Sequence, residues 1–538
     1  MNKIVSSVLP ALTLLLIASC GSVLSDQSDA GKESIVVHPV TEVDAALKAA
    51  SGTTTSGPVV GFEEAGIQIF KGIPYAAPPV GALRWKPPEQ VAAWTEPRAA
   101  QTFGFDCLQN RPGWDKSQSN MAMSEDCLFL NVWTPVSEGE PKALPVMVFV
   151  HGGGFVIGSG SQSVFDGGAL AKRGVVVVTF NYRVGRFGFF AHPELTAEAA
   201  GKATGNFALM DQLAALKWVQ ENIGSFGGDS TNVTVFGESA GGGSIASLMI
   251  AEESEGLFHK AIIQSGSGRI KWAPMKSQGK DNGAESTGVA FAAKQKINPP
   301  ALATLRKLSA DEILGEVSFS KLKSKIYSGP MIDGVLVDQN FVDAFVEGRQ
   351  HKIPLLIGFN SGELSHLGAV PKFVIGRSIK KGLKPHIPEI RAAYGSGKEM
   401  SRNLINDWGF SEPAWTMAKA HTEAGATAFL YEFDYVPTSL RNKYAAAPHA
   451  SELPFVFDTL DKYLDEPSAQ DQEVARRMTD AWVQFARTGS PVTADLPEWQ
   501  PQDSASSSLM RITQWGGELA SVRNLEAIKA LSQAADAK

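Results

Sequence analysis

The chain has 538 residues, of which 43 % are hydrophobic and 20 % are charged, a composition typical of globular proteins. Its formal net charge at pH 7 is only −7, and no basic run or stripe indicates a nucleic-acid partner. No internal repeat or long low-complexity tract is visible, so we expect a globular enzyme or binding protein rather than a repeat array.

The N-terminus predicts export. Lys3 supplies a positive charge, residues 8–18 are mostly apolar, and this run is too short to span a bilayer as a permanent helix. The ending Ile17-Ala-Ser-Cys20 resembles a bacterial lipobox, which implies a signal over residues 1–19 and a lipidated Cys20. Gly21 then implies outer-membrane sorting, the alternative being a cleaved signal and a periplasmic or secreted protein.

Two regions follow the signal. Residues 20–45 are rich in Ser, Asp, Gly and Lys without periodicity, which predicts a flexible tether, and residues 46–538 are predicted to form one domain. Apart from Cys20 the chain has two cysteines, Cys107 and Cys127. In an oxidising compartment they predict an intrachain disulfide, and the alternative is two free thiols.

The body alternates strand and helix signals. A hairpin is predicted at 57–70, and a polar, helical segment at about 272–325. Apolar runs at 144–150, 175–181, 233–238, 261–266 and 353–360 are typical of strands buried on both faces, and 331–338 also has strand character. Helical periodicity is clear at 206–223 and 472–486. The pattern predicts an α/β fold with a central, mostly parallel twisted sheet flanked by helices.

A candidate nucleophile lies within this pattern. Gly237-Glu-Ser-Ala-Gly241 joins a predicted strand to a predicted helix and occurs once as G-x-S-x-G. Such a sharp turn presents the serine hydroxyl above the sheet, and its glycines prevent clashes with the neighbouring elements. We therefore predict that Ser239 is a nucleophile at a helix N-terminus, rather than a chance match.

A glycine run after an earlier strand suggests an oxyanion hole. His151-Gly-Gly-Gly-Phe155 follows the buried strand at 144–150, and consecutive glycines let backbone N–H groups approach a ligand oxygen closely. The alternative is a flexible glycine turn. The second half of the hole would be the N–H of Ala240, directly after the serine.

A serine nucleophile needs a histidine base and a carboxylate that orients it, expected in the order serine, acid, histidine. His449, in a proline-bounded loop after a predicted strand, is preferred as the base. Glu363, directly after the strand at 353–360, is preferred as the acid, and Glu238 is interpreted as a buried carboxylate that tunes the site. The rejected candidates are His366, His386 and His421 for the base, and Asp333, Asp434 and Glu452 for the acid.

Several motifs in order resemble the type-B carboxylesterase family of the α/β-hydrolase fold. They are Gly72-Ile-Pro-Tyr-Ala-Ala-Pro-Pro, Ser124-Glu-Asp-Cys-Leu-Phe-Leu-Asn-Val, His151-Gly-Gly-Gly-Phe, Phe226-Gly-Gly-Asp, Phe236-Gly-Glu-Ser-Ala-Gly and His449-Ala-Ser-Glu-Leu-Pro-Phe-Val-Phe. The resemblance implies a triad of Ser239, Glu363 and His449, an oxyanion hole of Gly153, Gly154 and Ala240, and an early Cys107–Cys127 disulfide.

Two features depart from the family pattern. The acid loop reads Asn360-Ser-Gly-Glu-Leu, where the family more often has an aspartate before the glutamate and a glycine after it. The only tryptophan between the cysteines, Trp114, is not at the spacing of a choline-binding residue, so recognition of quaternary ammonium is not predicted.

The sequence therefore predicts a serine hydrolase that cleaves small to medium carboxylic esters through an acyl-enzyme. It predicts no cofactor or metal, a small-molecule ester as the substrate, and membrane contact only through the N-terminal anchor. The competing classes are a catalytically silent binding protein and another acyl hydrolase such as a lipase, an amidase or a carbamate hydrolase. The natural substrate and the oligomeric state stay open.

Overall fold

The computed structural model describes residues 38–39, 41–112, 119–136, 143–269, 271–278, 282–319, 322, 324–365, 369–496, 498–503 and 507–537. The predicted signal, Cys20 and most of the predicted tether lie outside these residues, as do Trp114 and His366. Within the described ranges, no helix combines the length and the apolar character needed to cross a membrane.

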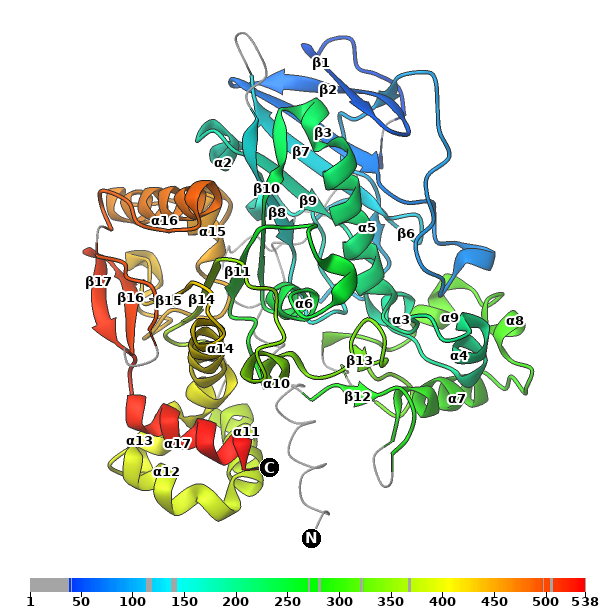
Figure 1. Cartoon of the computed structure of the whole chain (residues 1–538). Helices are drawn as coiled ribbons and strands as arrows, with labels where there is room; N and C mark the ends of the chain where they lie inside the picture. Colours follow the sequence, from blue (N-terminus) through cyan, green and yellow to red (C-terminus); the bar gives the residue numbers. More distant parts are fainter. Residues whose placement is uncertain are drawn as a thin grey trace.

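The molecule is built on one twisted sheet (Figure 1), in which the strand order is β1-β2-β3-β7-β9-β8-β10-β11-β14-β15-β16-β17, with β4 beside β2. The strands from β9 to β16 along this order run parallel, whereas both edges are antiparallel. This arrangement confirms the predicted mostly parallel sheet. The strands are β1 (Ala49–Thr54), β2 (Gly57–Glu64), β3 (Ile67–Pro74), β4 (Arg98–Ala99), β7 (Phe129–Pro135), β8 (Leu144–Val150), β9 (Val176–Phe180), β10 (Gly228–Glu238), β11 (Lys260–Gln264), β14 (Leu355–Asn360), β15 (Ala428–Phe433), β16 (Ser508–Thr513) and β17 (Gly516–Ser521).

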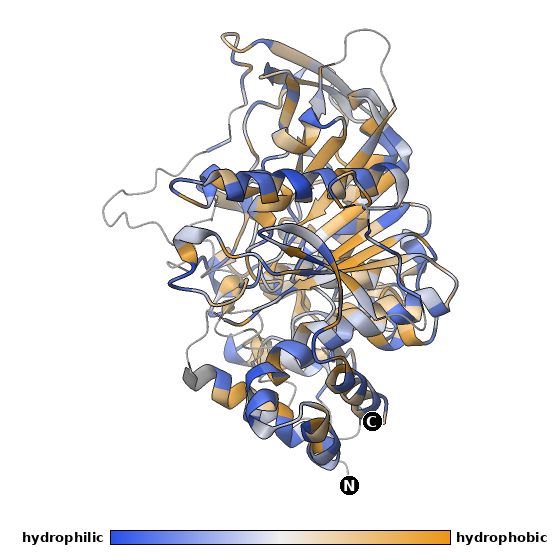
Figure 2. Cartoon of the chain, turned by 90° about the vertical axis from the view of Figure 1, so that its left-hand side faces the viewer, coloured by the Kyte–Doolittle hydropathy of each residue, from blue (hydrophilic) through white to orange (hydrophobic). Residues whose placement is uncertain are grey.

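Helices cover both faces of the sheet, and β8 shows why its sequence is almost continuously apolar. Alternate side chains of β8, such as Val148 and Phe149, belong to two different hydrophobic clusters, one on each face. Figure 2 shows the consequence, with hydrophobic strands in the centre and hydrophilic residues on the outer sides of the helices. The helices are α2 (Gly168–Lys172), α3 (Gly185–Gly188), α4 (Pro193–Ala199), α5 (Phe207–Asn222), α6 (Ala240–Leu248), α7 (Ala284–Lys294), α8 (Leu302–Leu305), α9 (Ala310–Leu314), α10 (Phe341–Val346), α11 (Ala369–Gly382), α12 (Ile387–Ala393), α13 (Gly397–Asn406), α14 (Glu412–Glu423), α15 (Leu453–Val456), α16 (Ala469–Thr488) and α17 (Leu525–Asp536).

The predicted strand at 331–338 is wrong beyond its first two residues. Only β13 (Met331–Ile332) forms, and it pairs with the short β12 (Ala273–Pro274). Asp333 then accepts hydrogen bonds from the backbone N–H groups of Val335 and Val337 through Oδ1, at 2.8 and 3.1 Å. An aspartate side chain that accepts hydrogen bonds from backbone N–H groups a few residues later stabilises a turn. This turn ends the strand.

The sequence patterns did not predict a helical region that lies at one end of the molecule. Helices α11, α12, α13 and α17 gather at the bottom of Figure 1. The π-helical turn η7 (Asp407–Ser411) joins α13 to α14 and returns the chain toward the carboxyl ends of the central strands. Such π-helical turns are rare and occur frequently at functional sites.

Candidate active site

The turn between β10 and α6 holds Ser239 in an unusual backbone conformation, with φ 56° and ψ −120°. Its backbone N–H donates to the Gln264 carbonyl at 2.9 Å. A Cβ on Gly237 would lie 2.6 Å from the Val150 oxygen, and a Cβ on Gly241 only 2.0 Å from the same atom. Both glycines are therefore required by the close approach of β8, as the sequence predicted.

Three side chains from distant parts of the sequence form one hydrogen-bonded chain. His449 Nε2 lies 2.9 Å from Ser239 Oγ, and His449 Nδ1 lies 2.5 Å from Glu363 Oε2. Glu363 follows β14, and His449 lies in the loop between β15 and α15. Because β14 and β15 are neighbouring parallel strands, their carboxyl ends meet at the same edge of the sheet.

The carboxylate of Glu363 is fixed from its other side. Glu363 Oε1 accepts hydrogen bonds from Ser265 Oγ and from the backbone N–H of Asn360, both at 2.7 Å. Its backbone is also held, because the N–H of Glu363 donates to Asn406 Oδ1 in α13 at 2.8 Å. The side chain is fully buried, so the imidazole has one oriented partner that water does not reach.

The rejected candidates that the structure describes have other partners. Asp333 Oδ2 accepts from Asn206, and Asp434 pairs with Arg523. His421 is enclosed by Gln350 and the Ile353 carbonyl, and His386 lies in a short 3₁₀ turn before α12. None of these four contacts Ser239 or His449 within the described residues.

Two further carboxylates lie close to the triad. Glu238 Oε1 is 3.0 Å from His449 Nε2, so this carboxylate faces the same nitrogen that lies 2.9 Å from Ser239 Oγ. The second is Glu452, which the sequence analysis rejected as a candidate for the acid. It accepts hydrogen bonds from Gln264 Nε2 at 3.0 Å and from Asn360 Nδ2 at 2.6 Å. Burial raises the pKa of Glu452, and the nearby charge of Glu363 adds to this effect.

The glycine loop after β8 has left-handed backbone at three consecutive residues, with φ 104° at Gly153, 63° at Gly154 and 63° at Phe155. The Gly153 carbonyl accepts from two later N–H groups and so closes a tight turn. Among the described residues, no acceptor takes a hydrogen bond from the N–H groups of Gly153, Gly154 or Ala240. These three backbone donors therefore have no partner within the described residues, as the prediction of an oxyanion hole requires.

His151 supports this loop, a role that the sequence analysis did not assign. Its Nδ1–H donates to the Gly152 carbonyl at 2.8 Å, and its ring stacks on Tyr182 with centroids 4.1 Å apart. The Tyr182 hydroxyl donates to the His151 carbonyl at 2.7 Å. Burial lowers the pKa of His151 to about 4, so the ring is neutral near pH 7 and acts as a fixed donor.

Ser239 and His449 open into a small cavity of about 50 Å³. Phe and Trp rings form part of its wall, and Trp272 meets Phe155 and Phe341 edge to face at centroid distances of 6.1 and 6.0 Å. The turn η7 contributes the remaining aromatic side chain, Phe410, which lies 5.3 Å from the His449 ring. The four rings come from four separate segments, so no local pattern identifies them.

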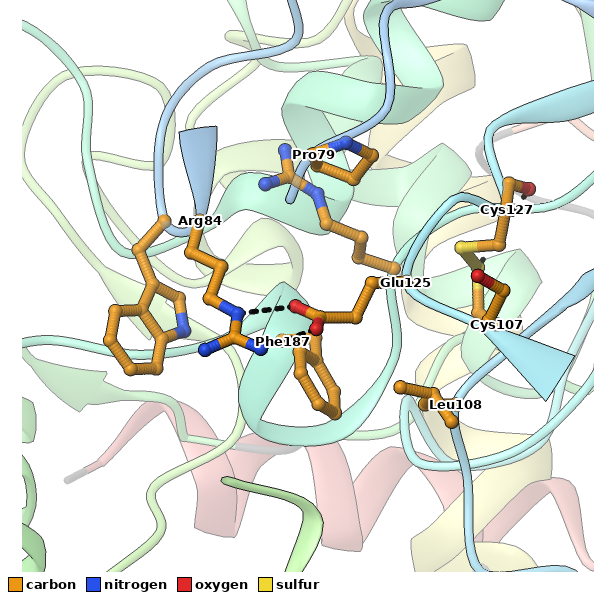
Figure 3. A pocket seen from close by; sticks show the side chains of 10 residues that line it. Pro79, Arg84, Cys107, Leu108, Glu125, Cys127 and Phe187 are labelled. Atoms are coloured by element: carbon orange, nitrogen blue, oxygen red, sulfur yellow. Dashed lines mark hydrogen bonds and ion pairs between the residues drawn. A yellow bond between two sulfur atoms is a disulfide. The ribbon is translucent and has the colours of Figure 1, made fainter. Parts of the chain in front are cut away.

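The predicted disulfide is present between Cys107 and Cys127. Figure 3 shows it beside a separate small cavity of about 10 Å³, next to the paired side chains of Arg84 and Glu125. Arg84 also donates to the backbone oxygen of Arg306 at 2.9 Å, which ties this loop to α8. The cavity has room for about one water molecule and contains none of the triad residues.

No group of three or more His, Cys, Asp or Glu side chains in the described ranges is arranged to hold a metal ion.

Comparisons with known proteins match most of the chain. The sequence model of the carboxylesterase family matches residues 48–381 and 385–525. The chain is 37 % identical over 465 residues to the para-nitrobenzyl esterase of Bacillus subtilis, covering 82 % of this chain and 90 % of that protein. It is 36 % identical over 463 residues to a fumonisin B1 esterase of Sphingopyxis macrogoltabida, covering 83 % of each chain. A solved PNB esterase structure superposes with a TM-score of 0.77 at 34 % identity, over 89 % of this chain and 99 % of that one.

Proposed function

Because the chain belongs to the carboxylesterase family and is a carboxylic-ester hydrolase, we propose that Ser239, His449 and Glu363 perform its catalysis. The observation that carries this proposal is the continuous hydrogen-bonded chain from Ser239 Oγ through both nitrogens of His449 to Glu363 Oε2. A serine is a weak nucleophile at its own pKa and needs such a base and orienting acid.

In the first half-reaction, Ser239 Oγ attacks the ester carbonyl carbon while His449 Nε2 takes the hydroxyl proton. The carbonyl oxygen becomes an oxyanion, which the N–H groups of Gly153, Gly154 and Ala240 are free to bind. The C–O bond to the alcohol then breaks, and the alcohol leaves with the proton from His449 Nε2. The product is an acyl group esterified to Ser239.

In the second half-reaction, water replaces the alcohol. His449 Nε2 takes a proton from the water, whose oxygen attacks the acyl carbon and forms a second oxyanion in the same hole. Collapse releases the carboxylic acid and returns the proton to Ser239. The buried carboxylates of Glu363 and Glu238 lie against opposite nitrogens of the imidazolium formed in each half-reaction, and so stabilise its charge.

The cavity beside Ser239 favours short acyl groups. Its volume of about 50 Å³ is well below the roughly 300–1,000 Å³ of pockets that enclose drug-sized ligands. The indole of Trp272, packed between Phe155 and Phe341, limits its depth. We expect acetyl and butanoyl esters to fit, and octanoyl esters to require movement of this ring.

The test is hydrolysis of p-nitrophenyl acetate, butyrate, octanoate and palmitate by the wild type and by Ser239→Ala. Ser247→Ala is the matched control, since this serine is also buried in the same region but bonds only the Gly243 carbonyl within α6. We expect activity on short chains that Ser239→Ala abolishes and Ser247→Ala retains. Absence of turnover by folded wild type on every ester would favour the binding-protein alternative.

Trp272→Ala tests the chain-length argument. We expect the ratio of octanoate to acetate kcat/KM to rise at least tenfold, because removal of the indole deepens the cavity. Trp415→Ala is the control, a buried tryptophan on α14 that does not line the cavity. An unchanged ratio in Trp272→Ala would contradict the role given to this ring.

We also propose that the protein is exported and anchored to the outer membrane through a lipid on Cys20. The signal-like N-terminus supports this proposal, and the Cys107–Cys127 disulfide is consistent with an oxidising compartment. Expression in a Gram-negative host with labelled palmitate is expected to label the wild type but not Cys20→Ala. Gly21→Asp is expected to redirect the labelled protein to the inner membrane. A wild type that carries no label would leave the periplasmic or secreted alternative.

A further inference from the structure

A second, larger cavity lies behind the loop that carries the catalytic acid. Its volume is about 920 Å³, and it contains neither Ser239 nor His449. Gly362 and Leu364, the neighbours of Glu363 in the chain, form one wall, and Asn406 and Asp407 form another. We call it the acid-loop cavity. It shares the acid loop and the turn η7 with the catalytic site, because Asn406 binds the Glu363 backbone and η7 supplies Phe410 to the catalytic cavity.

The third wall is cationic. Residues 364–388 contain five Lys or Arg and no Asp or Glu, in a chain whose net charge is −7. Three of these cations, Lys372, Arg377 and Lys380 on α11, line the cavity. No carboxylate in the described part of the chain lies within ion-pair distance of any of the three. Within the described ranges, Lys372 donates to the Ser365 carbonyl at 3.3 Å and Lys380 donates to Ser401 Oγ at 3.0 Å.

The acidic residues of the cavity do not balance this charge. Glu432 Oε2 is bound by Arg511 at 2.7 Å, and its Oε1 lies 3.1 Å from Arg523. Asp407 accepts from the Tyr394 hydroxyl at 2.8 Å and from Asn524 Nδ2 at 3.0 Å. Both carboxylates are buried and already bonded, so the three cations of α11 have no counter-charge among the residues that the structure describes.

Apolar side chains lie next to these cations. Leu404 and Ile405 of α13 are buried at the cavity wall, together with Phe359 from the end of β14. Phe373, one residue after Lys372, also lines the cavity although it is 68 % exposed. The cavity therefore offers an apolar surface directly beside cations, which is the pair of features that an amphiphilic ligand contacts.

We propose that the acid-loop cavity binds an anionic amphiphile, a carboxylate or phosphate group attached to an alkyl chain. The anionic head is held by Lys372, Arg377 and Lys380, and the alkyl chain lies against Phe373 and the buried face of α13. The volume accommodates a ligand of about ten to fifteen heavy atoms with solvent, within the range of small-molecule pockets. The ligand does not need the catalytic serine, so the site is independent of the ester-cleaving reaction.

The test measures binding of decanoate by calorimetry to the full chain carrying Ser239→Ala, so that no ester chemistry takes part. Decanol and acetate are the companion probes, because one has the tail without the charge and the other the charge without the tail. We expect decanoate to bind at least tenfold more tightly than either. We also expect its affinity to fall as the ionic strength rises from about 0.05 M to about 0.3 M, as for any exposed ion contact.

Two double variants in the same background separate the cavity from general attraction to positive charge. R377Q/K380Q removes two cations that line the cavity, and K381Q/K384Q removes two neighbouring cations that do not. We expect decanoate affinity to fall at least fivefold in the first and to change less than twofold in the second. Equal losses in both doubles, or equal binding of decanoate and decanol, would overturn the proposal.

Vesicles distinguish a free amphiphile from a lipid headgroup in a bilayer. If phosphatidylglycerol vesicles retain the protein, phosphatidylcholine vesicles do not, and R377Q/K380Q alone loses retention, the site takes the lipid form of the ligand. If decanoate binds and neither vesicle retains the protein, the ligand is the free amphiphile. If both double variants lose binding to the vesicles equally, the charged surface of the helix is responsible rather than the cavity. That result would overturn the proposal.

Discussion

The replacement Glu363→Gln tests the site most sharply, because the structure dictates how the amide must lie. The backbone N–H of Asn360 points at Glu363 Oε1 and is an obligate donor. The glutamine must therefore place its carbonyl oxygen there and its NH₂ group against His449 Nδ1. The NH₂ group can only donate, so Nδ1 has to become an acceptor and the proton moves to Nε2. An imidazole protonated at Nε2 cannot accept the proton of Ser239.

The expected loss in kcat follows from this wrong tautomer of His449. In serine hydrolases a replacement of this kind typically lowers kcat by about 10⁴, which corresponds to about 5.5 kcal/mol of transition-state stabilisation. The opposite orientation of the amide would set two donors against each other at the Asn360 N–H, and it would leave a buried polar group unsatisfied at a cost of about 1–3 kcal/mol. Because this cost is smaller than 5.5 kcal/mol, a minor fraction of molecules still reaches the flipped orientation, so we expect kcat to fall by between about tenfold and about 10⁴-fold.

Glu452→Gln is the control for this experiment. Glu452 is equally buried and lies three residues after His449, but it bonds the side-chain amides of Gln264 and Asn360 rather than the imidazole. The introduced amide faces one of these two donors with its own NH₂ group, which lowers stability but leaves the proton on His449 Nδ1 in place. Its kcat on p-nitrophenyl acetate is expected to stay within tenfold of wild type. If Glu363→Gln retains more than a tenth of the wild-type kcat while folded, the assignment of the acid is wrong.

Three other predictions concern stability. Gly241→Ala is expected to lower the free energy of unfolding by more than about 3 kcal/mol, because its Cβ would lie 2.0 Å from a backbone oxygen, and urea denaturation measures this. The double replacement of Cys107 and Cys127 by serine should cost about 3 kcal/mol, the loop-entropy value for a sequence separation of 20, whereas an effect below about 1 kcal/mol would contradict the entropic argument. Burial raises the pKa of Asp407 from 3.8 to about 6, so its contribution to stability is greatest below pH 4 and is lost as the pH rises through 6. The stability of Asp407→Asn relative to wild type should thus increase by up to about 3 kcal/mol between pH 4 and pH 7, and a pH-independent difference would exclude this titration.

The sequence predicted most of the sheet because each central strand carries a local signal. The run at 144–150 matches β8 residue for residue, and the segment before Ser239 forms the end of β10. These strands are buried on both faces, so their continuous apolar character is visible without any partner. By contrast, Asp333 ends the strand predicted at 331–338, since a single side chain that bonds the following backbone outweighs the β propensity of the valines after it.

The sequence by itself determined the nucleophile turn and the glycine loop, since both depend on backbone sterics within a few residues. It also restricted the acid and the base to a few candidates, among them Glu363 and His449. Only the tertiary structure brings these two within 2.5 Å across 86 residues of chain, sets Glu238 and Glu452 around them, and encloses the acid-loop cavity between α11 and α13. The physical reason is that periodicity and turn chemistry record local geometry. The distance between two side chains on separate loops depends instead on how the strands beneath them pair and how the helices beside them pack.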